Sequence, residues 1–326
     1  QGFRGLVAGG GTGDATVRLA KQLAEVAPDA EVVHVDLSEA SMAFAEERIR
    51  VLGLEIVRFA KFHLLDLTPD AFGRFDYVNC SGVLHHLPDP LAGLRALAGV
   101  LKPEAGGLSI MLYGAYGRVG IYHAQAIMRS LLSPDDDLDS AVSLTRSLLN
   151  QLPPSNWLVK KVGLKPDGRS PTAEIVDKYL HPHDKPFTVP DVFELADQAD
   201  LRFVSFLQPF WYEPAHAFRS KGMPERLAEM SFRERAAFAE LLHGAFHDKH
   251  MFYLTNRSAP LAPPSASASE SVPIWLGREL SADSRPMQLG GPIQTPLSRQ
   301  EWGMLCAIVG RRSLDYLAAH TRAEGP

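Results

Sequence analysis

The sequence predicts an α/β fold in which helices cover both faces of a mostly parallel sheet. Strand and helix patterns alternate through the first 113 residues with short connections, which is typical of parallel strands joined by crossover helices. A glycine-rich run separates the first strand from the first helix. Hydrophobic residues make up 45% of the 326 residues, enough to bury a sizeable core.

The first part of the chain supplies five strands and three of the helices between them. Each expected strand is a short, mainly apolar run, and the helices place apolar residues three and four positions apart. The strands are expected at residues 3–8, 31–37, 56–65, 75–80 and 108–113, and the helices at 14–26, 39–52 and 90–101.

The alternation is interrupted at Gly114, and residues 114–187 are expected to form a mostly helical insertion. The patterns then resume with a helix at 190–199, a strand at 202–207, a helix at 225–243 and a strand at 249–255. We therefore expect one domain over 1–257, a flexible Pro/Ala/Ser linker over 258–273, and an appendage of unknown role over 274–326.

Composition and charge exclude several classes of protein. The formal net charge of −5, with no long Lys/Arg cluster, argues against a general nucleic-acid binder. Cys80 and Cys306 lack the spacing of a disulfide framework or a zinc site, so a reducing cytoplasm is the expected compartment. No apolar run reaches the roughly 20 residues of a membrane helix. The chain starts at Gln1, just before the first strand, so we expect further residues before it in the native protein.

The glycine-rich run at residues 9–13 has the form of a nucleotide site. A tight turn between a strand and a helix lets a ligand approach the backbone and offers it free N–H groups. The nicotinamide fingerprint G-x-G-x-x-G fails because its last position is Asp14, and the P-loop fails because no lysine follows Gly13. What remains is G-x-G-x-G over Gly9, Gly11 and Gly13.

Five stretches, in order along the chain, carry a more specific signal. They are LVAGGGTGDATVRLA (6–20), VVHVDLS (32–38), HLLDL (63–67), FDYVNCSGVLHHLPDP (75–90) and LKPEAGGLSIMLY (101–113). In this order and spacing they resemble the class I S-adenosylmethionine-dependent methyltransferases. The resemblance covers roughly residues 1–113, and the later strands fit the rest of the family's seven-stranded sheet. It implies a Rossmann-like fold, S-adenosylmethionine as the cofactor, and methyl transfer.

Two acids match cofactor-binding positions of the family. Asp36 ends the second strand, followed by Leu37, where a carboxylate accepts hydrogen bonds from both ribose hydroxyls. Its alternative role is an N-cap for the next helix, which Ser38 could supply instead. Asp66, with Leu67 beside it, resembles the residue that accepts from the adenine amino group, and its alternative is a solvated turn acid.

The edge of the expected cleft raises two further points. Cys80 and Ser81 end the fourth strand, where ligands bind in open α/β sheets, and Cys80 is expected to pack rather than to act as a nucleophile. Many family members carry an acid two residues before the first glycine, where this chain has Val7. Backbone carbonyls near Gly9 could hold the cofactor's amino group instead, and Asp14 either assists them or caps the first helix.

Methyl transfer from a sulfonium is an in-line displacement that depends largely on positioning, so a dedicated base is optional. A protonated hydroxyl or ammonium acceptor needs one. His85 and His86 follow the fourth strand and are candidates for a base or an orienting group, and Tyr113 ends the fifth strand and is a candidate for the acceptor pocket. For all three, ordinary packing is the alternative.

Two histidine clusters suggest a metal: His181-Pro182-His183-Asp184 and the set His243, His247 and His250. The second set has the spacing of one helical face, but His250 is expected to start a strand and no clear carboxylate or cysteine partner is evident, so we expect no metal site. The run 210–212, Phe-Trp-Tyr, forms either an aromatic wall for the acceptor or part of the core.

The acceptor is a small molecule or a protein side chain. The large insertion would enclose a small molecule well, whereas the appended segment after residue 273 would suit a partner or a protein substrate. We give slightly more weight to a small molecule, only because such acceptors are the more common ones in the family that the chain resembles. Alternatives are other chemistry on the same cofactor, or a non-catalytic scaffold that binds the cofactor. The sequence gives no indication of the oligomeric state.

Overall fold

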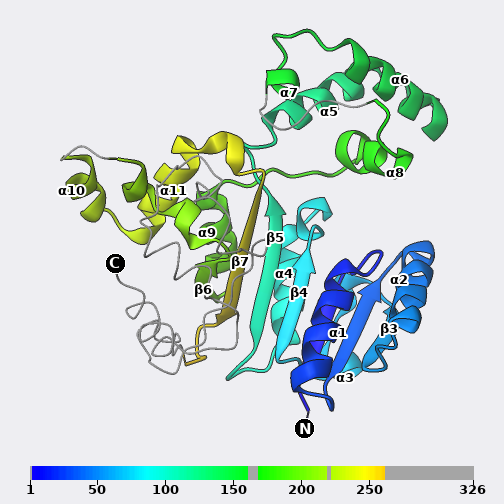
Figure 1. The fold of residues 1–326 in the computed structure, drawn as a ribbon, viewed down its shortest axis with the longest axis vertical. Coiled ribbons are helices and arrows are strands. Elements are labelled where there is room, and N and C mark those ends of the chain that lie inside the picture. Colours follow the sequence, from blue (N-terminus) through cyan, green and yellow to red (C-terminus); the bar gives the residue numbers. More distant parts are fainter. Residues whose placement is uncertain (1, 161–167, 219–221, 261–326) are drawn as a thin grey trace, which may run out of the picture. The chain divides into compact units, whose positions relative to one another are not determined.

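A computed structural model describes residues 2–160, 168–218 and 222–260 of the chain (Figure 1). Residues 1–259 form one compact unit. The linker and the appendage expected over 258–326 lie almost entirely outside the described residues, so both stay predictions. No helix in the described part is long and apolar enough to cross a membrane.

The central element is a seven-stranded sheet in the order β3-β2-β1-β4-β5-β7-β6. All pairings are parallel except those of β7, which runs antiparallel to both β5 and β6. This confirms the predicted fold class. The strands are β1 (Arg4–Ala8), β2 (Glu31–Asp36), β3 (Val57–Lys61), β4 (Tyr77–Ser81), β5 (Gly107–Tyr113), β6 (Leu201–Phe206) and β7 (Lys249–Asn256).

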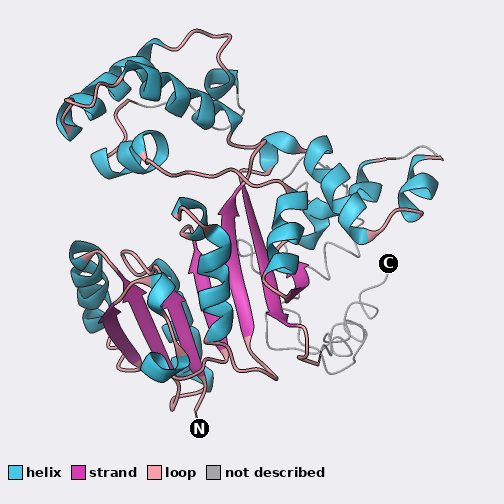
Figure 2. Ribbon diagram, turned by 180° about the vertical axis from the view of Figure 1, so that it is seen from behind, coloured by secondary structure: helices cyan, strands magenta, loops and turns pink. Residues whose placement is uncertain are grey.

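Helices lie on both faces of this sheet (Figure 2). Those of the sheet region are α1 (Asp14–Val26), α2 (Glu39–Val51), α3 (Pro69–Phe72), α4 (Pro90–Gly99), α9 (Val189–Gln198), α10 (Met223–Ala228) and α11 (Phe232–Leu242). Short turns of helix are η1 (Leu64–Asp66), η2 (Leu84–His86), η4 (Pro209–Tyr212), η5 (Pro214–Ala217) and η6 (Gly244–Phe246).

The strands are apolar on both sides because the sheet is buried on both faces. Leu6, Val33 and Val78 are completely buried and join one large core with residues of α4, α9 and β7. Val7 and Val32 face the opposite side, where they pack with Ala20 and Leu23 of α1. This two-sided burial holds the carboxyl ends of β1, β2, β4 and β5 along one edge.

Two sequence predictions differ from the structure. The third strand ends at Lys61, and the residues beyond it form η1 and α3, because Thr68 caps α3 and Pro69 opens it. The helix expected over 225–243 is two helices, α10 and α11. Ser231 and Glu234 form a capping box that starts α11, which separates it from α10.

The insertion is helical, as its sequence indicates, and has a small core of its own. Its elements are α5 (Val119–Leu131), α6 (Leu138–Gln151), α7 (Trp157–Lys160), α8 (Thr172–Ile175) and η3 (Val176–Leu180). Ile121, Val142 and Ile175 are among the buried residues of that core. Figure 1 shows these helices beyond the carboxyl end of β5, the edge at which ligands bind in open α/β sheets.

Candidate functional site

The glycine loop follows β1 and adopts a backbone that requires glycine. Gly9, Gly11 and Gly13 have φ values of 68°, 52° and 91°, in the left-handed region. A Cβ at Gly9 would approach Val83 to 2.3 Å, whereas a Cβ at Gly11 would meet nothing within 4 Å. The loop is therefore packed at Gly9 against the turn after β4 and open at Gly11, where a ligand can approach the backbone.

A buried histidine of β2 packs against the glycine loop. His34 in β2 is completely buried and shares a 2.8 Å hydrogen bond between its Nδ1 and the Thr16 hydroxyl. Burial lowers the pKa of His34, so the ring is neutral near pH 7. A Cβ at Gly10 would approach this ring to 2.3 Å, which explains why three glycines follow one another. The sequence analysis did not identify this role of His34.

Asp36 is fixed at the end of β2 by two backbone donors. Its carboxylate accepts from the Gly11 N–H at 2.7 Å and from the Ser38 N–H at 2.8 Å. Ser38, not Asp36, caps α2, because its hydroxyl accepts from the Ser41 N–H. Each carboxylate oxygen keeps a further lone pair, so the group can still accept from ribose hydroxyls. Leu37, next to it, is 54% exposed.

The structure places the other expected cofactor residues at the same edge but in different surroundings. Asp66 is exposed in η1, whereas the Leu67 side chain is buried in the main core. Cys80 is completely buried, and burial raises the pKa of its thiol to about 12, as expected of a packing residue. Ser81 is exposed, and its hydroxyl donates to the Asn79 side chain.

No acidic side chain from position 7 or 14 reaches the interior of the glycine loop. Val7 is buried beside His34 in the parallel pairing of β1 and β2. Asp14 points outward, with its side chain 82% exposed and a 2.7 Å ion pair to Arg48. Gly13 is the N-cap of α1, which leaves Asp14 in the first turn, where a carboxylate favours the helix dipole.

A stack of aromatic and cationic groups lies at the ends of β4 and β5. The His85 ring packs on Tyr113 with 4.0 Å between ring centroids, and the Arg118 guanidinium lies 3.5 Å from the Tyr113 centroid. His85 also contacts His86, whose ring stacks on His181 at 3.9 Å. The three expected catalytic residues are thus in mutual contact.

His85 is completely buried, and neither of its ring nitrogens has a hydrogen-bond partner in the described part of the chain. Burial, with further contributions from His86 and Arg118, lowers its pKa to about 2, so the ring is neutral near pH 7. Burial also raises the pKa of Tyr113, which keeps this hydroxyl protonated.

The chain returns from the insertion across this cluster. The Lys185 N–H donates to the His85 carbonyl at 2.9 Å, and the His86 Nδ1–H donates to the His183 carbonyl at 2.8 Å. Asp184 is almost fully buried and pairs with Arg118 at 3.2 Å. The sequence analysis missed Arg118 and gave Asp184 no role at this edge, because roughly a hundred residues separate it from the two histidines.

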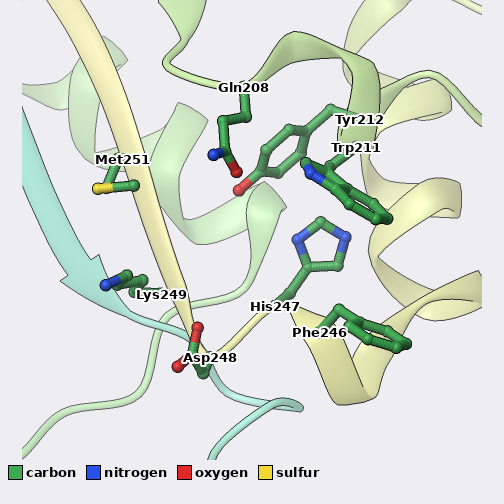
Figure 3. A pocket seen from close by; sticks show the side chains of 8 residues that line it. All are labelled: Gln208, Trp211, Tyr212, Phe246, His247, Asp248, Lys249 and Met251. Carbon is green, nitrogen blue, oxygen red and sulfur yellow. The ribbon is translucent and has the colours of Figure 1, made fainter. Parts of the chain in front are cut away.

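A cavity of about 210 Å³ lies farther along the same edge, between η4 and the start of β7 (Figure 3). Trp211, Tyr212 and His247 gather on one side of it, as Figure 3 shows. Phe210 does not line this cavity and instead stacks on His216. Two of the three expected aromatic residues, Trp211 and Tyr212, therefore line this cavity next to Lys249, which pairs with Tyr113 in the sheet. Tyr212 also belongs to the main core, so the role of these rings toward an acceptor stays a prediction.

Comparison with known proteins identifies a methyltransferase domain in the chain. A family profile described as a methyltransferase domain matches residues 6–108, which include the glycine loop, Asp36 and Asp66. The structure of PKMT2 from Rickettsia typhi in complex with AdoHcy has the same fold, with a TM-score of 0.66 and 15% identity, covering 99% of this chain and 66% of that chain. Residues 6–108 therefore carry a methyltransferase domain, and the chain has the fold of the S-adenosylhomocysteine-bound neighbour.

This methyltransferase is also similar to curated proteins. It is 32% identical over 241 residues to an uncharacterised protein of Synechococcus sp., covering 73% of this chain and 56% of that protein. It is 36% identical over 93 residues to the demethylmenaquinone methyltransferase of Bacillus cytotoxicus, covering 28% of this chain and 38% of the relative. A ubiquinone biosynthesis O-methyltransferase of Xanthomonas campestris is 38% identical over 109 residues, with coverages of 27% and 45%. The chain spans about half or less of the length of these relatives.

Proposed function

We propose that this methyltransferase moves a methyl group from S-adenosylmethionine to an oxygen or nitrogen atom of a small molecule. One observation carries the proposal. The open glycine loop with Asp36, and the cluster of His85 and Tyr113, follow the carboxyl ends of neighbouring parallel strands. Parallel strands bring such ends to one edge of the sheet, which is where a cofactor and an acceptor can meet.

The cofactor half of the proposed site follows from the loop and the strand ends. The Asp36 carboxylate accepts from the ribose hydroxyls, and the open backbone at Gly11 lies along the cofactor. Asp66 accepts from the adenine amino group, while buried Cys80 packs under the cofactor. The full proposed set is Gly9, Gly11, Gly13, Asp36, Leu37, Asp66, Leu67, Cys80 and Ser81.

The acceptor half is proposed to use His85, His86 and Tyr113. With a pKa of about 2, His85 is too weak a base to take a proton from the acceptor, but it can orient the acceptor by hydrogen bonding. His86, with 15% of its side chain exposed, is the candidate for a base. The protonated Tyr113 hydroxyl can donate a hydrogen bond to the acceptor. Displacement at the sulfonium carbon itself needs only alignment and exclusion of water.

Enclosure favours a small acceptor. The cluster is covered by the returning segment that carries His181 and Asp184, and His85 is inaccessible to solvent. A protein side chain is the second candidate. It is favoured by exposed apolar groups: Phe246, which lines the cavity of Figure 3, is 57% exposed. Leu207, whose N–H donates to the carbonyl of the cavity residue Met251, is 41% exposed.

The test is to divide a cell extract by ultrafiltration into small molecules and macromolecules. Each part is then supplied with methyl-labelled S-adenosylmethionine and the protein. Label and S-adenosylhomocysteine appearing with the small-molecule part are the expected result. Label transferred only to protein would establish the second candidate. Binding of the cofactor without turnover in either part would point to a scaffold and contradict the proposal.

A further inference from the structure

Three potential ligands for a cation meet at the ends of β4 and β5. One ring nitrogen each from His85 and His86 and one carboxylate oxygen of Asp184 all lie within 4.8 Å of one another. The two histidines come from η2, and Asp184 comes from the segment after η3. The hydrogen bond from the Lys185 N–H to the His85 carbonyl ties the two segments together.

Two of these side chains have buried polar atoms without a partner. Both nitrogens of His85 and the Oδ1 atom of Asp184 are inaccessible to solvent and accept or donate no hydrogen bond within the described ranges. A buried polar atom left in this state costs about 1–3 kcal/mol. Their shared location therefore indicates that the folded protein places something between them.

The second ring nitrogen of His86 and the second carboxylate oxygen of Asp184 form hydrogen bonds of the kind that orient metal ligands. The His86 Nδ1–H donates to the His183 carbonyl, so in the neutral ring Nε2 carries the lone pair. This Nε2 lies 3.9 Å from the Asp177 carboxylate. Asp184 receives Gln125 at 2.8 Å and Arg118 at 3.2 Å on its Oδ2 atom, which leaves Oδ1 available. Backbone and side-chain partners of this kind set the tautomer and direction of ligands in metal sites.

The charges around the cluster have both signs. Asp184 belongs to the cluster and Asp177 lies 3.9 Å from the His86 ring, whereas Arg118 and His181 act on His85 as cations. Arg118 opposes a second cation, but its charge is already offset by the ion pair with Asp184. The cluster also contains two imidazoles, and neutral imidazole is a common ligand of transition metals and a poor one for Mg²⁺.

We propose that His85, His86 and Asp184 bind a divalent first-row transition ion of the Zn²⁺ type, leaving coordination positions open. In a tetrahedral site, bond lengths of about 2.0–2.2 Å separate two ligand atoms by roughly 3.3–3.6 Å. The three atoms lie within 4.8 Å of one another, so a small closure of the groups would complete the site. His86 has the freedom to do this, since 15% of its side chain is exposed.

This site was not expected from the sequence, because its ligands lie far apart along the chain. A bound ion would have a consequence that rests on the proposed function. It would lower the pKa of a coordinated acceptor hydroxyl, so that the hydroxyl proton could pass to solvent water while the lone pairs of His85 and His86 serve as ligands.

The experiment uses the full chain without an affinity tag, stripped with a chelator and titrated with Co²⁺, whose visible absorption reports coordination. We expect one Co²⁺ per chain, displaced by Zn²⁺ but not by Mg²⁺. His86→Ala and Asp184→Asn should each weaken binding at least about tenfold, while His123→Ala, which removes an exposed histidine of α5, should leave it unchanged.

Absence of stoichiometric binding in the wild-type chain would overturn the proposal, as would equal affinity in the wild type and both ligand variants. Because Asp184→Asn also removes a partner of Arg118, Gln125→Met is a second test that keeps all three ligands. It should weaken Co²⁺ binding about tenfold. Affinity for S-adenosylmethionine, measured on the same samples, separates the two proposals: normal cofactor binding without metal binding overturns only the metal site.

Discussion

The two halves of the candidate site satisfy their buried polar groups in different ways. In the cofactor half, the Asp36 carboxylate already accepts two backbone N–H groups, and the loop is packed against His34 and Val83. In the acceptor half, His85, Arg118 and Asp184 each have a buried polar atom without a partner within the described residues, whereas beside the glycine loop this holds for His34 Nε2. The loop and Asp36 are held by contacts that are already present, and more of the buried polar atoms of the acceptor half lack a partner.

The largest expected effect concerns the buried ion pair of the acceptor half. Arg118→Met should lower the free energy of unfolding by about 3–5 kcal/mol, because it leaves the Asp184 charge buried and unpaired. Chemical denaturation measures this. Lys61→Met is the matched control in the cofactor half, where Lys61 and Glu39 form an exposed pair worth less than about 1 kcal/mol. Equal losses in the two variants would contradict the contrast between the halves.

Asp36→Ala should weaken S-adenosylmethionine binding about 100-fold, since it removes charge-assisted hydrogen bonds to the ribose. Calorimetric titration measures the affinity. Glu39→Ala removes a nearby acid that is bonded to Lys61, and it should bind the cofactor like the wild type. Unchanged affinity of the Asp36 variant would show that the cofactor half has been assigned to the wrong loop.

The pH dependence of stability provides a test at the cavity of Figure 3, which His247 lines. Burial lowers the pKa of His247 from 6.5 to about 4, so the unfolded chain takes up its proton at a higher pH than the folded one. The stability that comes from keeping this ring neutral is complete above pH 6.5 and is lost as the pH falls to 4. The loss is at most about 3 kcal/mol.

Comparing wild type with His247→Phe isolates this contribution. The difference in unfolding free energy at pH 8 measures packing alone, and its change between pH 6.5 and 4 measures the titration. A difference that stays constant with pH would mean that the His247 ring reaches solvent when protonated.

The smallest effect separates backbone strain from ligand contact. Gly11→Ala and Gly53→Ala both place a Cβ in open space at positive φ, 52° and 62° respectively. Each should lower stability by about 1–2 kcal/mol. Only Gly11→Ala should also weaken cofactor binding. Similar binding in both variants would show that the open face of Gly11 is not in contact with the cofactor.

Local sequence patterns account for most of the cofactor half. Its parts are a strand, a glycine turn with positive φ, a capped helix and an acid at a strand end. Each of them is a short segment whose residue pattern predicts one local structure. The boundaries between α10 and α11 were harder to predict, because the capping box at Ser231 interrupts an otherwise continuous helical pattern.

The sequence by itself determined the fold class, the place of the glycine loop and the acid that follows β2, because these depend on contacts between residues close together in the chain. Only the tertiary structure decided how the acceptor half is built. His85 and His86 meet Asp184 because the sheet aligns the ends of β4 and β5 and the insertion returns across them. The spacing of these residues in the sequence does not predict this contact, because it depends on how the long insertion packs back onto the sheet.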